Sequence, residues 1–122
     1  MKRNILEAAV TLASNVFNVR SRHGAVIFTD NKILGRGYNR KIKGFNKVHT
    51  FHAETSAAFN AHDKFPREIN GAYCLVIRIN KRGKLTNSKP CDCCQKTLKA
   101  YGIKEVFYSV EGGAICQMKL QV

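Results

Sequence analysis

The feature that most restricts the fold of this 122-residue chain is a succession of strand, helix and strand between residues 72 and 108. The first strand is the unbroken apolar run 72–77, of a kind that occurs in sheets covered on both faces. A helix is expected to begin near Cys91 and to stop at Gly102. Residues 103–108 supply the second strand. Because a helical crossover joins parallel strands, this segment predicts an α/β fold.

The N-terminal half predicts further elements around this unit. Apolar side chains recur every three or four positions over residues 2–17, which indicates an amphipathic helix. Residues 24–28 and 33–38 are rich in β-forming side chains and flank a turn-forming tetrad, so they predict a hairpin. Residues 39–50 lack apolar periodicity and are expected to form a loop. The helical pattern returns over residues 51–62.

The whole chain, residues 1–122, is expected to form one domain. Its composition, 44% hydrophobic and 24% charged, is typical of globular domains. Residues 85–90 are expected to form a return loop, and residues 114–122 an edge strand. No apolar run is long enough to span a membrane, and polar residues interrupt what would be the core of a signal peptide. We therefore expect an intracellular, cytoplasmic protein.

Three of the five cysteines crowd into positions 91–94, which is poor geometry for a disulfide framework and favours a metal site. Cys91 and Cys94 fall on the first turn of the expected helix, where one metal ion can contact both. His52 opens the other helix and would be the third ligand. Three protein ligands leave the fourth tetrahedral position to water, as in catalytic zinc sites. The pattern predicts a Zn²⁺ cofactor.

Glu54 is the expected catalytic residue beside this site. Zinc lowers the pKa of a bound water to about 7. From its place two residues after His52, Glu54 can lean over that water without ligating the metal, accept its proton and deliver one to a substrate. Structural zinc knuckles and redox dithiols share the Cys spacing, but a structural site has no need of this carboxylate.

Two other side chains compete for the metal. His49 would ligate it if the helix began earlier. Cys93, two positions after Cys91, points to a different helix face and is expected to be a neighbour rather than a ligand. Structural or ordinary roles are expected for the remaining candidates: Cys74, Cys116, His23 and His62.

The formal net charge of +13 favours polyanionic partners such as a nucleotide or a nucleic acid. A basic surface that serves only solubility is the alternative. Two groups of basic residues lie near the motifs in the sequence and would bind phosphates. They are Arg40, Lys41, Lys43 and Lys47, and Lys81, Arg82 and Lys84.

The segments His52-Ala53-Glu54 and Pro90-Cys91-Asp92-Cys93-Cys94 together spell the H-x-E…P-C-x-x-C signature of zinc nucleobase deaminases. The chain thus resembles the cytidine and deoxycytidylate deaminase superfamily, in the branch whose first zinc ligand is His. The resemblance covers about residues 1–110 and includes Gly37-Tyr38-Asn39. It implies a three-layer α/β/α sandwich around a mixed five-stranded sheet.

The resemblance also implies a set of substrate contacts. Asn39 would hydrogen-bond the substrate, and the backbone N–H of Ala53 would donate to the base. The carbonyl of Lys89 would receive the amino group, although its side chain departs from the Glu or Ser common in relatives. Tyr108 would stack on a base; the alternative is a sheet aromatic packed in the core.

By this resemblance the chain is expected to be a zinc-dependent hydrolase that deaminates a cytosine nucleoside or nucleotide and releases ammonia. A deaminase of cytosine or adenosine in tRNA or single-stranded nucleic acid is the alternative. A C-terminal helix that contributes substrate contacts in many such relatives is not evident here. A third possibility is a non-catalytic nucleic-acid-binding module with structural zinc. Relatives usually associate through helices that flank the sheet, so a homo-oligomer is expected.

Overall fold

A mixed sheet of six strands forms the centre of the protein. The computed structural model describes residues 1–16, 21–30, 32–44 and 47–120, and within residues 41–51 it describes the backbone alone. Five strands are hydrogen-bonded in the order β2-β1-β5-β7-β8. The short strand β6 is not part of this order and pairs with β5. The strands are β1 (Arg22–Phe28), β2 (Ile33–Tyr38), β5 (Tyr73–Ile79), β6 (Leu85–Thr86), β7 (Glu105–Ser109) and β8 (Ile115–Lys119).

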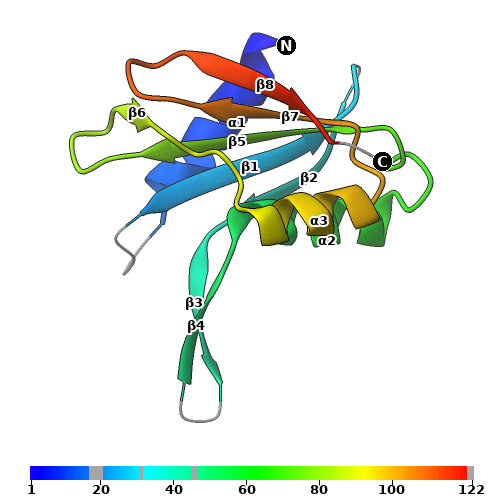
Figure 1. Ribbon diagram of the computed structural model, residues 1–122, viewed down its shortest axis with the longest axis horizontal. Helices are drawn as coiled ribbons and strands as arrows, with labels where there is room; N and C mark the ends of the chain where they lie inside the picture. Colours follow the sequence, from blue (N-terminus) through cyan, green and yellow to red (C-terminus); the bar gives the residue numbers. More distant parts are fainter. Residues whose placement is uncertain (17–20, 31, 45–46, 121–122) are drawn as a thin grey trace.

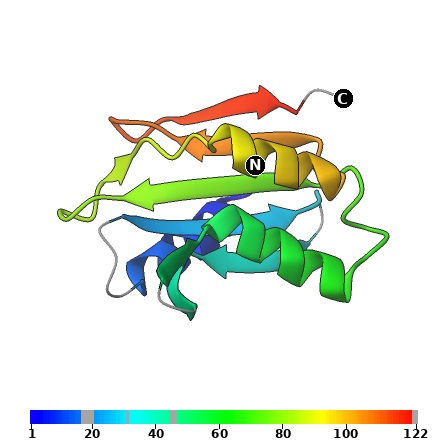
Figure 2. The same cartoon turned by 60° about the horizontal axis from the view of Figure 1, so that its bottom comes forward.

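Helices cover both faces of this sheet. On one face α1 (Arg3–Ser14) packs on β1 and β5 through an apolar cluster that includes Ile5, Val26 and Leu75. On the other face α2 (Ala53–Lys64) and α3 (Asp92–Ala100) lie side by side, as Figure 2 shows. The predicted three-layer α/β/α sandwich around a mixed five-stranded sheet is therefore confirmed, and β6 adds a sixth strand to that sheet. Among the residues described, no helix is both long and apolar enough to cross a membrane.

The strand, helix and strand expected between residues 72 and 108 are confirmed. β5 and β7 pair in parallel, with Cys74 opposite Val106 and Val76 opposite Tyr108. The chain crosses between them through β6 and α3 (Figure 1). The expected edge strand is β8, which pairs antiparallel with β7; residues 121 and 122 lie outside the described part. The predicted hairpin is also present as β1 and β2.

The loop predicted over residues 39–50 is wrong. Residues Arg40–Gly44 (β3) and Lys47–Phe51 (β4) pair antiparallel as a separate two-stranded ribbon that extends away from the main sheet (Figure 1). Alternation of apolar and polar residues marks a strand only where one of its faces is buried. A ribbon that pairs only with itself and leaves the sheet does not require that pattern.

Smaller differences lie at the ends of elements. The return loop expected over residues 85–90 contains β6, whose two residues pair with Arg78 and Ile79. Helix α1 ends at Ser14 rather than at residue 17, which lies outside the described part. Helix α2 begins at Ala53 and ends at Lys64, a shift of two residues from the prediction at each end. Helix ends depend on capping and fraying, and periodicity places them poorly.

Two glycines let α2 lie directly on the sheet. A Cβ atom built at Gly37 would stand 2.5 Å from the carbonyl oxygen of Ala53, and one at Gly35 would stand 2.5 Å from that of Ala57. Both distances are below 3.0 Å, which real Cβ atoms essentially never show. The small residues of β2 therefore set the height of α2 above the sheet, and with it the position of the segment that opens the helix.

Candidate metal centre and active site

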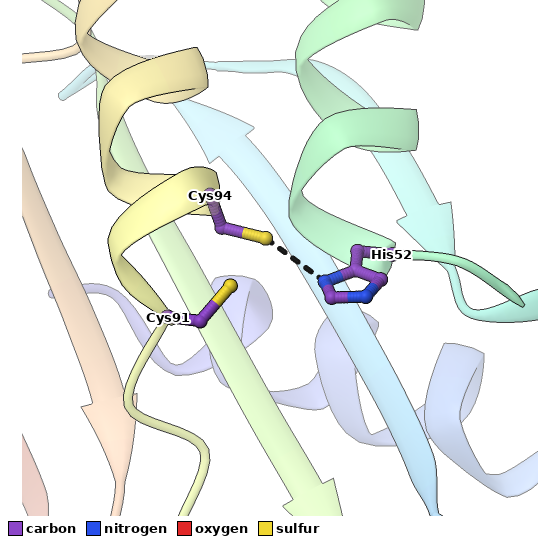
Figure 3. Close-up of side chains that lie close together, drawn as sticks. All are labelled: His52, Cys91 and Cys94. Atoms are coloured by element: carbon purple, nitrogen blue, oxygen red, sulfur yellow. Dashed lines mark hydrogen bonds between the residues drawn. The ribbon is translucent and has the colours of Figure 1, made fainter.

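Two helix starts bring the predicted metal ligands together. His52 is the N-cap of α2 and Cys91 is the N-cap of α3, and both have extended backbone conformations. Cys94 projects from the first turn of α3. The His52 Nδ1 atom lies 2.9 Å from the Cys94 Sγ atom, and the ligand atoms of all three residues lie within 4.8 Å of one another. Figure 3 shows the three side chains directed into the space between the two helices.

This geometry fits a zinc ion. Zinc binds Cys sulfur at about 2.3 Å and His nitrogen at about 2.0 Å, so tetrahedral ligand atoms stand roughly 3.5 to 3.8 Å apart. The His52 Nδ1 and Cys94 Sγ atoms, 2.9 Å apart, would separate by roughly 0.6 Å to share the ion. Cys94 is 4% exposed, whereas His52 and Cys91 are exposed. The site is thus anchored in the core on one side and open on the other, and burial raises the pKa of the free Cys94 thiol, to which the nearby Glu54 carboxylate adds.

Glu54 lies beside the three ligands but outside their cluster. Its side chain, on the first turn of α2, is 5% exposed. Burial raises the pKa of the Glu54 carboxyl, and a hydrogen bond from its own backbone, His52 and Cys94 partly oppose that shift. A raised pKa favours uptake of a proton by the carboxyl, which suits a group that accepts a proton and returns it during a reaction. This placement suits the predicted role of Glu54.

The competing ligands are not brought to the site. Cys93 is exposed and is not part of the metal-binding cluster formed by the described residues. His49 belongs to β4, and its side chain lies outside the described part. His62 lies near the C-terminal end of α2, where its ring contacts that of Tyr101 at 5.5 Å. Cys74 is buried, as expected, and Cys116 is half-buried.

Asn39 is already engaged in hydrogen bonds at the end of β2. Its Oδ1 atom accepts from the His23 N–H at 2.8 Å, and its Nδ2 atom donates to the Ser21 carbonyl. The predicted substrate contact must therefore use the second N–H or the second lone pair of the amide. Ala53 is fully buried at the start of α2, between His52 and Glu54. The substrate contacts of both residues stay predictions.

The segment before Cys91 is tied to the sheet by two buried serines. Ser88 Oγ donates to the Val76 carbonyl at 2.8 Å and accepts from the Ser109 N–H at 2.8 Å. Lys89, the next residue, is exposed, and its N–H donates to Asn87 Oδ1 at 3.1 Å. Ser88 and Ser109 thus fix the position of the Lys89 carbonyl and of Cys91 relative to the sheet. Sequence reasoning did not find this pair, because its partners are 21 residues apart.

Tyr108 is half-buried on the sheet face that α2 and α3 cover, where it packs against the apolar cluster beneath them. This position agrees with the packing alternative. Stacking of Tyr108 on a base stays a prediction.

Two further residues reach this end of the sheet. His23 and Arg78 face each other across β1 and β5. Burial lowers the pKa of His23 to about 4, and the positive charges of Arg78 and His52 contribute to that shift. His23 had been expected to be an ordinary residue. The polar Arg78 within the apolar strand Tyr73–Ile79 was the one sequence signal that could have pointed to this pair.

Comparison with known proteins agrees with this site. The family model for the cytidine and deoxycytidylate deaminase zinc-binding region matches residues 1–110. The apo dCMP deaminase of the cyanophage S-TIM5 is 28% identical, with 88% of this chain and 84% of that chain covered and a TM-score of 0.61. In its complex with dCMP and dUMP the identity is 24%, the coverage 88% and 82%, and the TM-score 0.57. No curated protein matches the chain.

Another solved structure shares the fold over nearly the whole chain. Cytidine deaminase from Burkholderia pseudomallei is 21% identical, with 98% of this chain and 94% of that chain covered and a TM-score of 0.72. The family match spans most of the sequence, including the three clustered ligands, whose geometry accepts a zinc ion. The chain therefore belongs to the cytidine and deoxycytidylate deaminase family of zinc-dependent hydrolases.

Proposed function

We propose that this enzyme hydrolyses the exocyclic amino group of a cytosine nucleoside or nucleotide, with His52, Cys91 and Cys94 as zinc ligands and Glu54 as the proton carrier. The observation that carries the proposal is the place of Glu54, which is buried beside a cluster of three ligands without belonging to it. A structural zinc site has no use for a buried carboxylate at that position. The dCMP and cytidine deaminases among the similar structures support the choice of cytosine.

The residues of the chain divide the chemistry between them. Zinc, when bound by His52, Cys91 and Cys94, supplies Lewis acidity that lowers the pKa of a water to about 7. Glu54 accepts a proton from the attacking water, delivers a proton to the ring nitrogen, and assists the departure of ammonia from C4. The Ala53 N–H and the Lys89 carbonyl hold the base edge and the amino group. The remaining hydrogen-bonding capacity of Asn39 is directed to the substrate.

The substitution Glu54→Gln tests the mechanism, because it preserves size and removes the proton acceptor. We expect one zinc ion per chain in both proteins and a loss of ammonia release by several orders of magnitude, since general acid–base catalysis alone contributes about 10²–10⁴-fold. Asp63→Asn, the corresponding change at an exposed position in the last turn of α2, serves as the control. Unchanged turnover by the Glu54 variant would refute the assignment.

A polynucleotide deaminase is the second candidate. The observation that favours it is the β3–β4 ribbon, which carries four basic residues and leads directly to His52. Ammonia release should be compared for cytidine, deoxycytidine, their monophosphates, adenosine and single-stranded RNA and DNA. Activity on strands alone that falls steeply with salt would favour this candidate over the nucleotide deaminase.

A further inference from the structure

The cross-strand pair His23 and Arg78 lies on the same face of the sheet as the metal-binding cluster. Alternate residues of a strand point to one face. Ala25 and Ile27 of β1 and Cys74 and Val76 of β5 belong to the apolar cluster beneath α2 and α3. His23 and Arg78 continue these two series, each two residues beyond a member of the cluster and directly opposite each other.

His23 and Arg78 lie towards the end of the sheet that the N-termini of α2 and α3 face. The start of α2 lies over Gly37, which pairs with Ala25, so His52 stands close to the level of His23. The positive charge of His52 contributes to the lowered pKa of His23, which agrees with this nearness. At neutral pH His23 is therefore uncharged, and Arg78 is the permanent cation of the pair.

Within the described part of the chain, no carboxylate forms an ion pair with Arg78. Its Nε atom is buried and has no hydrogen-bond partner among the described residues. All eight Asp and Glu side chains belong to the described part of the chain, and the ion pair found there joins Arg3 to Glu7. Burying an unpaired charged donor is costly, and native proteins pair nearly all such groups. An anion from outside the chain would complete this site.

The backbone of Arg78 is held firmly. Its N–H donates to Ser109 Oγ at 3.1 Å, and it stands opposite Thr86 at the base of the β5–β6 hairpin. The Arg78 guanidinium thus extends from a fixed position at the edge of the active site. A planar guanidinium is well matched to two oxygen atoms of a phosphate.

We propose that Arg78 binds a phosphate group of the substrate, with His23 beside it on the neighbouring strand. This inference rests on the proposed deaminase function and specifies its substrate class. The reacting base belongs near Glu54 and Cys94, whose charges act on Cys74. Arg78 lies two residues beyond Val76, which is level with the start of α2 through its pairing with Ala25, or about 7 Å further at 3.3 Å per residue. In a nucleotide, the phosphate is the group farthest from the reacting amino group, and it would point towards Arg78.

The test compares substrates with and without phosphate in Arg78→Gln. The substrates are deoxycytidine, dCMP and a short cytosine-containing DNA strand. Because hydrogen bonds to charged groups contribute about 1.5–3 kcal/mol, we expect kcat/KM for dCMP to fall roughly 10- to 150-fold and kcat/KM for deoxycytidine to change less than about twofold. A fall only on the strand would identify an internal phosphodiester as the ligand. Equal falls on deoxycytidine and on the phosphate-bearing substrates would overturn the proposal.

Arg67→Gln is the matched control, because Arg67 is an exposed arginine just beyond the opposite end of α2. It should leave all three substrates unaffected. Zinc content should remain at one ion per chain in every variant. If deoxycytidine is deaminated and the kcat/KM for dCMP is the same in Arg78→Gln as in the wild type, the phosphate site is refuted while the deaminase function stands. If wild-type protein with bound zinc deaminates no cytosine or adenine compound, the proposed function itself is refuted.

Inorganic phosphate provides a second measurement that does not depend on the folding of a variant. With wild-type enzyme, we expect it to compete with dCMP and to leave turnover of deoxycytidine unchanged. It should also raise the melting temperature of the wild type, and that of the Arg67 variant by the same amount. Absence of both effects at phosphate concentrations well above the KM for dCMP would overturn the proposal.

Discussion

The contact between α2 and β2 should control the affinity for zinc through Gly37. An alanine there would place its Cβ 2.5 Å from the Ala53 carbonyl oxygen, in the first turn after His52. To reach ordinary van der Waals contact at 3.4 Å, the helix start must retreat by about 0.9 Å. The His52 Nδ1 atom would retreat with it, away from the position about 3.5 Å from the Cys94 Sγ atom that it must hold to share a zinc ion.

The size of the effect follows from the tolerance of metal sites. Ligand distances in metal sites hold to within about 0.2 Å, so a retreat of this size from the zinc-bound position exceeds what the site can absorb without strain. We expect Gly37→Ala to weaken zinc binding about 10- to 100-fold, the range seen when a group that orients a metal ligand is lost. Overpacking should in addition lower the free energy of unfolding by about 1–3 kcal/mol.

Gly35→Ala is the matched control, since it presses on the same helix one turn further on, with the Ala57 carbonyl oxygen 2.5 Å away. It should lower the free energy of unfolding by a similar amount and weaken zinc binding much less. Zinc affinity is measured by competition with a chromogenic chelator, and stability by urea unfolding of the zinc-loaded proteins. Equal zinc affinities in the two variants, at equal stability, would refute the idea that β2 sets the position of His52.

Two further predictions concern the buried polar groups at the same end of the sheet. Ser109→Ala should lower the free energy of unfolding, measured by urea denaturation, by about 1–3 kcal/mol, because it leaves the Thr86 carbonyl and the Arg78 N–H without their partner. Ser14→Ala, at an exposed serine of α1, is the control and should have little effect. The pKa of His23 falls from 6.5 to about 4 on folding, so between these pH values the unfolded chain binds more protons than the folded protein. The stability contributed by neutral His23 is therefore present above pH 6.5 and is lost as the pH falls towards 4. Unfolding measured from pH 7 to 4 should show a shallower loss in His23→Gln than in the wild type, and parallel curves would contradict this account.

The sheet and its helices were predictable because burial leaves a mark on the sequence. The strands β1, β5 and β7 bury consecutive residues, and α1 buries one stripe, so their apolar patterns locate them. The β3–β4 ribbon leaves no such mark, since it pairs outside the main sheet. Its strands are detectable only from their pairing with each other, which a single sequence does not display.

The metal centre was predictable for a different reason, which is that its geometry is local. Each ligand stands on the first turn of a helix or caps it, so the three-position spacing of Cys91 and Cys94 fixes two of the three ligands. One long-range relation remained, the approach of α2 to α3, and the resemblance to a known family supplied it. The Ser88–Ser109 pair and the His23–Arg78 pair depend instead on strand register, which aligns residues 21 and 55 positions apart.

Asn39 shows why substrate contacts are harder to predict than metal ligands. Its position in Gly37-Tyr38-Asn39 suggested a substrate role, yet both ends of its amide already bond the backbone of Ser21 and His23. These bonds hold the end of β2 against the start of β1, where His23 stands opposite Arg78. An amide has two N–H groups and two lone pairs on its oxygen, so Asn39 retains one of each for a ligand. The same side chain can therefore order the wall of the site and contact what binds there, and only the folded structure reveals the first of these roles.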